Sequence, residues 1–401
     1  MSAFWLVRPT ILIVPDKFKG TLTAGEVAQA IARGWRKARR LDELDLLPMS
    51  DGGDGFGEVL GKLLRAKTET VKTVDAAHRS CKARWWWEPK TKTAVIESAQ
   101  VIGLAVLPPG KFHPFDLDTF GLDAVIRAAS AKGAHRCIIG IGGSATNDGG
   151  FGLGRALGWE FLDRDGNLIE QWTGLPALAR VRAPGRRRWF DELIVAVDVQ
   201  NPLLGVRGAT RIYGPQKGLK SPELEIAERN LRRLAQVVAR ERFGAPALAG
   251  PNRLQAKLQT HPGSGAAGGL GFGLLAFLGA RAEPGFDLFA RCANLDERLR
   301  SADLVITGEG RLDESTLMGK GVGQIAKRCR ELKIPCIALA GMVSERDKVQ
   351  RAFTRVHALA EISTLAKAKA KPILWLERLA ESAALEFKFQ PGWRSRAQAK
   401  A

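Results

Sequence analysis

The sequence predicts an α/β protein with a mainly parallel sheet, because short apolar strands alternate with amphipathic helical segments along the chain. A length of 401 residues predicts two domains, since a single hydrophobic core rarely serves more than about 250–300 residues. Several predicted strands end in loops that combine glycine with acidic or hydroxyl residues. Ligands of parallel sheets bind beyond the carboxyl ends of the strands, so these loops form the candidate site.

The predicted elements begin with a buried strand at 10–16 and a helix at 23–38, in which Thr23 and Glu26 have the spacing of a capping box. The three tryptophans at 85–87 are typical of a hairpin strand, and we favour packing over base stacking for them. Further strands are predicted at 135–143, 192–199, 302–310 and 335–341, with helices near 319–332 and at 221–244, the latter opened by Ser221 with Pro222 as its first residue.

The composition indicates a soluble globular protein, with 45% apolar and 26% charged residues. The sequence contains no run of 18 apolar residues, so no membrane span is predicted. Its N-terminal residues lack the basic region and cleavage site of a signal peptide. The five cysteines are scattered without a CxxC pair, so neither a disulfide framework nor a zinc site is expected. We expect a cytoplasmic protein without a membrane partner, present as a monomer or homodimer.

The net charge of +19 has two explanations, nucleic-acid binding or a basic surface on an enzyme with anionic substrates. The excess is spread over separate clusters, at 36–40, 186–188 and 367–371. No helix-turn-helix, zinc-finger or RNP-like aromatic pattern occurs in the sequence. We therefore expect no nucleic-acid partner and favour an anionic small-molecule substrate.

Two glycine-rich loops follow strands near the N-terminus. "PDKFKG" (15–20) places Asp16, Lys17 and Lys19 after the first strand. "SDGGDG" (50–55) contains two carboxylates separated by unsubstituted backbone, in Asp51, Gly52, Gly53 and Asp54. Such carboxylates can hold Mg²⁺ or orient a hydroxyl, although Asp-Gly pairs also form ordinary turns.

The third loop, "GIGGSATNDGG" (140–150), begins with the G-x-G-x-x-A spacing of a dinucleotide-binding turn. Glu160 or Asp163 could supply the acidic residue that such a fold places on a ribose. The loop also carries polar side chains that a turn around a pyrophosphate does not need, in a group of Gly143, Ser144, Thr146, Asn147 and Asp148. These side chains suit a hydroxyl, a carboxylate or a metal-bound phosphate, and the dinucleotide match is weak.

Two later loops complete the pattern. Asp198 closes a strand, Asn201 follows it, and Lys217 lies in "GPQKG". An acid and a lysine at a strand end suit phosphoryl transfer, since one can orient a hydroxyl and the other can neutralise phosphate charge. The segment 307–321 offers Gly308, Glu309, Gly310, Arg311, Asp313 and Lys320, and no Walker GxxxxGK[ST] motif occurs. The loops together indicate an enzyme that handles a phosphorylated ligand and a small polar acceptor.

The sequence resembles the bacterial glycerate kinases. The resemblance covers about residues 10 to 345 and is carried by "PDKFKGTLTAGEVAQAI", "SDGGDGFGEVL", "GIGGSATNDGGFGLGRALG", "VDVQNPLLGVRGATRIYGPQKG", "PGSGAAGGLGFGLLAFLGA" and "DLVITGEGRLDESTLMGK". It implies ATP-dependent phosphorylation of D-glycerate with Mg²⁺, usually to 2-phosphoglycerate. It also implies two α/β domains, a Rossmann-like domain formed by residues 1–64 and 285–401 and an inserted domain at 65–284, with the active site in the cleft between them.

On this resemblance we expect in-line transfer of the ATP γ-phosphoryl group. Asp198 or Asp16 would orient or deprotonate the glycerate hydroxyl, and Lys217 or Lys19 would neutralise the transferring phosphate. Asp313, Glu309 and the pair Asp51 and Asp54 are candidates for contact with a metal or a ribose. Arg311 could bind the glycerate carboxylate or a phosphate through two hydrogen bonds.

The sequence also departs from the family pattern. Lys17 stands where the family often has Ser, and Asp54-Gly55-Phe56 replaces Glu-Gly-Thr. The Gly/Thr-rich helix start of the family is reduced to "DTFGLDAV" (118–125), and "GVGQIA" follows Lys320 in place of a Pro-containing stretch. These differences leave two alternatives to D-glycerate phosphorylation: a non-catalytic or altered-specificity homologue acting on another small hydroxy-acid, and an NAD-dependent oxidoreductase.

Overall fold

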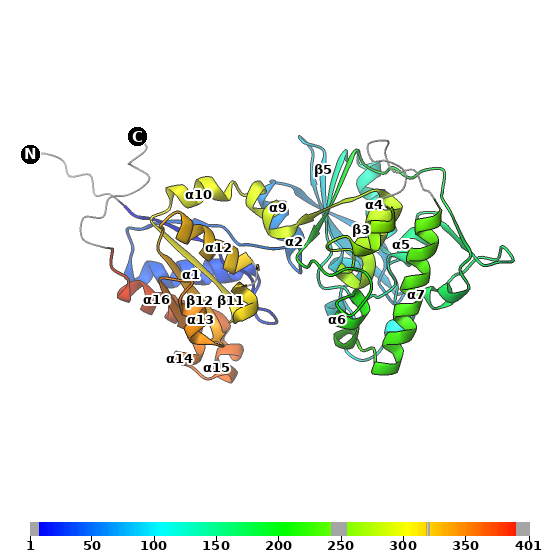
Figure 1. The fold of residues 1–401 in the computed structure, drawn as a ribbon. Helices are drawn as coiled ribbons and strands as arrows, with labels where there is room; N and C mark the ends of the chain where they lie inside the picture. The colour runs from blue at the N-terminus through cyan, green and yellow to red at the C-terminus, as the bar shows by residue number, and fades with distance from the viewer. Residues whose placement is uncertain (1–7, 242–254, 318, 320, 390–401) are drawn as a thin grey trace, which may run out of the picture. The chain divides into compact units, whose positions relative to one another are not determined.

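The computed structural model describes residues 8–241, 255–317, 319 and 321–389 (Figure 1). The chain divides into two compact units, which we call the discontinuous unit (residues up to 50 and from 289 onward) and the continuous unit (51–288). The predicted domain boundaries differ from this division, because they assign residues 51–64 and 285–288 to the discontinuous domain. The predicted cleft between the domains stays a prediction.

The discontinuous unit is built on a five-stranded sheet in which all neighbouring strands are parallel. In spatial order its strands are β13 (Arg355–Ala358), β12 (Cys336–Val343), β11 (Leu304–Leu312), β1 (Thr10–Ile13) and β2 (Glu43–Leu46). Counted along the chain within this unit, the order is 2-1-3-4-5, that of the flavodoxin-like doubly wound sheets. Strand order reverses between β1 and β11, and ligands of such folds bind at that switch point.

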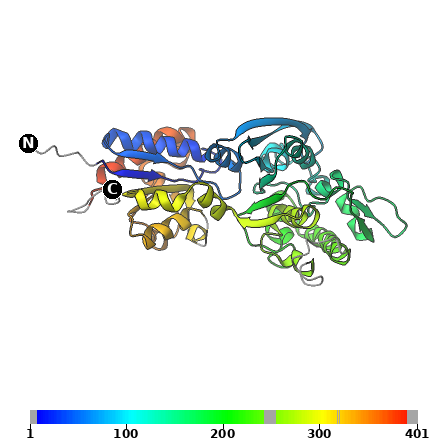
Figure 2. The ribbon, with the colours of Figure 1, turned by 90° about the horizontal axis from the view of Figure 1, so that it is seen from above.

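Helices cover both faces of this sheet. Figure 2 shows α1 (Ala24–Ala38, blue) and α16 (Pro372–Glu386, red) on one face, with yellow helices that include α10 (Leu295–Ser301) and α12 (Gly321–Glu331) on the other. The apolar faces of α1 and α16 pack with β1, β11 and β12 in one buried core. The shorter helices are α11 (Glu314–Leu317), α13 (Arg346–Gln350), α14 (Leu359–Ile362) and α15 (Leu365–Ala370). Helix α1 begins after Thr23, and the capping box predicted with Glu26 is confirmed.

The continuous unit contains a mixed six-stranded sheet. Its order is β10 (Arg281–Pro284), β9 (Glu192–Val197), β6 (Arg136–Gly140), β5 (Thr93–Glu97), β4 (Ser80–Glu88) and β3 (Lys67–Val74). The first four strands are parallel, whereas β3 and β4 are antiparallel additions. A separate antiparallel pair joins β7 (Glu160–Leu162) to β8 (Arg180–Arg182). The carboxyl ends of β5, β6, β9 and β10 therefore meet at one edge.

The helices of this unit surround a second buried core. The α-helices are α2 (Phe56–Leu63), α3 (Ala99–Ile102), α4 (Leu122–Ala131), α5 (Phe151–Ala156), α6 (Ala209–Lys217), α7 (Ser221–Arg240) and α8 (Leu270–Leu278), and α9 (Gly285–Cys292) spans the division between the units. The 3₁₀-helices are η1 (Leu104–Val106), η2 (Pro114–Asp116), η3 (Trp172–Ala177), η4 (Gln255–Thr260) and η5 (Ala266–Gly269).

The tryptophan strand explains why α2 belongs to the continuous unit. Trp85, Trp86 and Trp87 lie in β4 and are at most 8% exposed, so packing rather than base stacking is confirmed. Gly57 and Gly61 lie on α2 against Trp86, and a Cβ at these positions would come within 1.8 and 2.4 Å of the indole ring. The two glycines therefore let α2 sit directly on β4, with which the sequence pattern alone did not group it.

The boundaries of α7 and β1 are among those that differ from the sequence prediction. Helix α7 is capped by Lys220, whose backbone N–H donates to the Glu223 carboxylate at 2.7 Å, so Ser221 is the first helical residue and Pro222 the second. The helix ends at Arg240, and most of the predicted extension to 244 lies outside the described residues. The strand predicted to reach residue 16 ends at Ile13, although Val14 and Asp16 continue to donate hydrogen bonds to β11. No helix within the described part of the chain has the length and hydropathy of a membrane span.

Candidate functional site

The switch point of the discontinuous unit brings two predicted loops together. The N–H of Asp16, just beyond β1, donates to the carbonyl of Gly308 in β11 at 2.8 Å. A Cβ on Gly310 would lie 3.4 Å from the backbone nitrogen of Lys19. The "PDKFKG" loop therefore rests on the end of β11, which places the backbone of residues 16–19 beside that of 308–310.

One buried hydroxyl at this edge links the carboxylate of Glu309 to the backbone of Asp313. The hydroxyl of Thr316, which has no exposed surface, donates to Oε1 of Glu309 at 2.6 Å and accepts from the N–H of Asp313 at 3.2 Å. Oδ1 of Asp313 accepts from the N–H of Ser315 at 2.9 Å. Sequence reasoning selected Glu309 and Asp313 but missed Thr316, which fixes one relative to the other.

The cations of this edge are more exposed than its acids. The Arg311 side chain is 61% exposed, lies 3.6 Å from Oδ2 of Asp313 and donates to the Ser344 hydroxyl at 3.1 Å. Lys19 is exposed and Lys17 half-buried, and the N–H of Lys17 donates to Oδ1 of Asp16 at 2.7 Å. Lys320, also predicted for the site, lies outside the described residues.

In the continuous unit, the "SDGGDG" loop crosses the carboxyl ends of three strands. The carbonyl of Gly52 accepts from the N–H of Gly142, beyond β6, at 3.0 Å. A Cβ on Gly52 would lie 3.0 Å from the carbonyl oxygen of Ala196 in β9, and one on Gly285, after β10, would lie 1.6 Å from that of Asp51. The glycines of this edge thus allow the chain to pack closely against itself, and they bring residues 51–54 to the loop that begins at residue 140.

The neighbouring strand β5 supplies a buried acid, Glu97, that sequence reasoning missed. Its carboxylate is 4% exposed and accepts from the N–H groups of Gly55 at 3.0 Å and Gly57 at 2.9 Å. Burial raises the pKa of Glu97, against the opposing effect of these two hydrogen bonds. The available signal was an acidic residue closing the apolar run "TAVIE", the same pattern that selected Asp198.

Asp148 of the "GIGGSATNDGG" loop faces inward. It has no exposed surface, and Oδ2 accepts from the N–H and hydroxyl of Thr119, at 3.0 and 2.7 Å, and from the N–H of Gly152 at 2.9 Å. Oδ1 accepts from the N–H of Gly150 at 3.2 Å, at the start of α5. Burial, with a contribution from Asp118, raises the pKa of Asp148 to about 6. The carboxylate therefore ties the loop to the 118–125 segment.

The remaining polar groups of this loop also bond within the unit. The hydroxyls of Ser144 and Thr146 lie 2.9 Å apart, and the side-chain amide of Asn147 donates to the Thr210 hydroxyl at 3.0 Å. The ammonium of Lys217, 8% exposed at the end of α6, donates to the carbonyl of Thr146 at 2.6 Å. Burial lowers the pKa of Lys217 to about 7, opposed by the charge of Asp148.

Asp198 lies beyond the end of β9 and is exposed, unlike Asp148. Asn201, also predicted, donates to the carbonyl of Arg207 at 2.7 Å and accepts from the Tyr213 hydroxyl at 2.7 Å. Tyr213, which sequence reasoning missed, is the only tyrosine in the chain. Burial and then the charge of Asp198 raise the pKa of Tyr213 to about 12. The protonated phenol donates to Asn201 and thereby stabilises the loop after β9.

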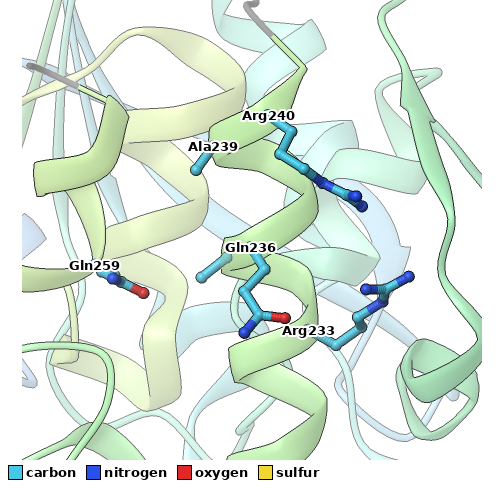
Figure 3. A pocket seen from close by; sticks show the side chains of 6 residues that line it. Arg233, Gln236, Ala239, Arg240 and Gln259 are labelled. Atoms are coloured by element: carbon cyan, nitrogen blue, oxygen red, sulfur yellow. The ribbon is translucent and has the colours of Figure 1, made fainter. Parts of the chain in front are cut away.

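The structure brings the predicted residues into two groups, one in each unit. Within the described residues, no cluster of three or more His, Cys, Asp or Glu side chains could hold a metal ion. A hollow of about 390 Å³ opens on α7 beside η4, and Figure 3 shows Gln259 at its wall, with the side chains of Arg233 and Arg240 pointing away from it. None of the described residues predicted for the site lines this hollow.

Comparisons with known proteins agree on one family. The model of the glycerate kinase family matches residues 11–388. A glycerate kinase of Halalkalibacterium halodurans is 37% identical over 339 residues, 84% of this chain and 86% of that protein. A glycerate 2-kinase of Escherichia coli is 36% identical over 341 residues, with the same two shares. A crystal structure from Salmonella typhimurium, provisionally named glycerate kinase 2, superposes with a TM-score of 0.76 at 33% identity, covering 94% of this chain and 97% of that one.

Proposed function

This chain belongs to the glycerate kinase family and is a small-molecule kinase, and on that premise we propose that it transfers the γ-phosphoryl group of ATP to D-glycerate. The observation that carries the proposal is the extent of the family match. It runs from residue 11 to 388 and therefore includes all the glycine-rich loops at the strand ends of both units.

We further propose that the product is 2-phosphoglycerate, as the name of the Escherichia coli relative suggests. In the reaction, the glycerate hydroxyl oxygen forms a bond to the γ-phosphorus while the bond from that phosphorus to the bridging oxygen of ADP breaks. The hydroxyl proton passes to a carboxylate of the protein. Positioning and charge neutralisation supply most of the catalysis in transfers of this type.

Asp198 and Asp16 are the candidate proton acceptors, and exposure supports Asp198. It is exposed at the carboxyl end of β9, whereas Asp16 is half-buried and accepts from its neighbour's backbone. Among the lysines, burial separates the two candidates: Lys217 is buried against the Thr146 carbonyl, whereas Lys19 is exposed. We propose that Lys19 neutralises the transferring phosphate, that Lys217 holds the loop after β6, and that exposed Arg311 binds an anionic group of a substrate.

A magnesium ion would fit the carboxylate pair of the discontinuous unit. Mg²⁺ in kinases is bound by one or two carboxylates together with substrate phosphates, so it does not need a larger protein cluster. Glu309 and Asp313 are half-buried at the same strand end, and Thr316 links the Glu309 carboxylate to the Asp313 backbone, so either acid or both could supply such a ligand. When bound, the ion would neutralise charge on the ATP phosphates. Asp51 and Asp54 stay candidates for contact with a metal or a ribose.

A coupled ADP-release assay with D-glycerate and related hydroxy-acids tests the activity, with the product identified by NMR. We expect ADP release with D-glycerate and a phosphate on carbon 2. Release only with another hydroxy-acid would support altered specificity, for which the divergent 118–125 segment is the reason. Absence of release with every hydroxy-acid would refute the kinase proposal. In the same assay, Asp198→Asn should lower kcat by about 10²–10⁴-fold with the fold intact, and near-normal turnover would transfer the role to Asp16.

A further inference from the structure

The buried acid Glu97 has a place in the fold that none of the family motifs quoted above includes. It ends strand β5, at the same edge as the loops after β6 and β9. Both of its carboxylate oxygens accept hydrogen bonds from the start of helix α2: Oε1 from the N–H of Gly55 and Oε2 from the N–H of Gly57. These two amides belong to the start of α2, directly after the "SDGGDG" loop.

Helix α2 lacks a cap from its own sequence. Its N-cap residue is Gly55, at φ 88°, which offers no side chain, and no side-chain cap hydrogen bond is made from that position. The first amides of a helix have no partner within it, and its N-terminus favours negative charge. The carboxylate of Glu97, 42 and 40 residues away along the chain, therefore takes the place of a local cap.

This arrangement fixes the loop that precedes the helix. At one end of the loop, the Gly52 carbonyl accepts a hydrogen bond from the N–H of Gly142. At the other, Glu97 holds Gly55 and Gly57. Between these anchors, Oδ1 of Asp54 lies against Gly143, where a Cβ would come within 2.0 Å of it. Asp51 and Asp54 thus lie in a loop that Glu97 holds through the backbone at its end, and burial and, to a smaller extent, the charge of Asp54 raise the pKa of Glu97.

We propose that Glu97 is a positioning residue of the kinase reaction, which holds the 51–54 loop in its working conformation by capping α2 from a neighbouring strand. The inference rests on the proposed function, since it takes Asp51 and Asp54 to contact a substrate or its metal. Glu97 accepts hydrogen bonds from two backbone amides and from the side chain of Gln100, and it also interacts electrostatically with Asp54. Loss of the carboxylate should release the loop without removing any group that faces the substrates.

Steady-state kinetics of Glu97→Gln and Glu97→Asp test this role. Glu97→Gln replaces one acceptor oxygen by a donor and should lower kcat/KM by about 10- to 100-fold, the usual cost of losing an orienting hydrogen bond at a site. Because the loop would contact one substrate, we expect KM to rise for either ATP or glycerate but not for both. In a double-mutant cycle, the effect of Asp51→Asn should be much smaller in the Glu97→Gln background than in the wild type.

Glu88 provides a matched control. It is 8% exposed, lies at the opposite end of the β4–β5 hairpin, and accepts from the N–H groups of Lys90 at 2.9 Å and Thr91 at 2.6 Å. Glu88→Gln removes the same kind of carboxylate from two backbone amides at a distance from the carboxyl edge of the sheet. It should lower the midpoint of thermal unfolding, as Glu97→Gln does, but leave both KM values unchanged.

Amide hydrogen exchange gives a readout that does not depend on turnover. In Glu97→Gln, the amides of residues 52–57 should exchange faster, while those of Lys90 and Thr91 keep their wild-type rates. Wild-type exchange at 52–57, a wild-type kcat/KM, or additive effects with Asp51→Asn would each overturn the proposal. If the wild-type protein itself releases no ADP with any hydroxy-acid, the proposed function fails, and the exchange rates still decide whether Glu97 holds the loop.

Discussion

The loops after β6 and β11 have the same signature in the sequence but opposite arrangements in the structure. Both combine glycines with acids and other polar residues at the carboxyl end of a parallel strand. After β6, Thr146, Asn147 and Asp148 have no exposed surface and bond to their own unit. At the carboxyl end of β11, the Arg311 and Asp313 side chains are 61% and 30% exposed.

This difference shows that a glycine-rich polar loop at a strand end can either stabilise the fold or present charged groups to a ligand. Most buried polar groups find hydrogen-bond partners within the protein, and such a network restricts a loop to one conformation. The loop after β6 therefore acts mainly as a scaffold, and its acid caps α5 as Glu97 caps α2. The loop after β11 presents charge outward, where it can meet a ligand. Mutations can separate these two purposes, because a scaffold loses stability and a presenting loop loses activity.

Within this comparison, the largest expected effect on activity comes from Asp313→Asn. The amide keeps an oxygen for the Ser315 N–H, so the free energy of unfolding should stay within about 1 kcal/mol of the wild type. Loss of the charge should lower kcat/KM by about 100-fold or more, equivalent to about 2.7 kcal/mol in the activation free energy. Urea unfolding and the ADP-release assay measure the two quantities. Wild-type activity would break the comparison, since the outward acid would then have no catalytic use.

The second effect, on stability, comes from Asp148→Ala. Four hydrogen-bond donors, from Thr119, Gly150 and Gly152, would lose their acceptor in a fully buried place. We expect the free energy of unfolding to fall by about 3 kcal/mol, the scale for opening a buried hydrogen-bonded charge. Urea titration monitored by tryptophan fluorescence measures this loss. A variant as stable as the wild type would contradict the scaffold role of this loop.

The third prediction concerns pH and the same carboxyl group. Its pKa is about 6 in the folded protein against an ordinary value of 3.8, so the folded state binds the proton more readily than the unfolded chain. Stability contributed by this group therefore rises as pH falls from about 7 toward 4, by about 2–3 kcal/mol. The difference in unfolding free energy between wild type and Asp148→Asn, measured at pH 7 and pH 4.5, isolates this contribution. A difference that does not change with pH would show that Asp148 is not the group that titrates.

The smallest effect is expected for Thr316→Val, which removes the hydroxyl that joins Glu309 to Asp313. The buried Asp313 N–H and Glu309 Oε1 would each lose one partner, at a cost of about 1 kcal/mol in stability. Activity should fall by less than 10-fold, since both acids stay in place. Thr316→Ser should restore both quantities. A loss of activity as large as that of Asp313→Asn would mean that the hydroxyl itself meets a ligand.

The fold was largely predictable because its signals are local. The capping box of Thr23 and Glu26, the tryptophan hairpin and the order of strands and helices all depend on residues close in sequence. The packing of α2 on β4 could not be predicted from the sequence, because the contact of Gly57 and Gly61 with Trp86 joins segments that no local pattern relates.

Within the candidate site, the sequence located the loops but not the direction of their side chains. Nothing in "SATND" distinguishes a side chain that bonds to Thr119 or Thr210 from one that faces solvent. The sequence also selected Lys217 for its charge, whereas the structure buries it against a carbonyl. Glu97 and Thr316 were missed because their importance lies in partners, Gly55 and Glu309 among them, that only the tertiary structure supplies.

The position of β1 between β2 and β11 has a consequence for synthesis of the chain. Val14 and Thr307, which share a hydrogen bond, are 293 residues apart, and the whole continuous unit is translated between them. At a translation rate of about 5–20 residues per second, β11 is synthesised roughly 15–60 s after β1. One edge of β1 is unpaired during this time, while residues 51–288 can fold without interruption. An unpaired strand edge invites pairing with other chains. The sheet that carries Glu309 and Asp313 is therefore completed last, and the nascent protein is most exposed to aggregation at the strand that will anchor its own switch point.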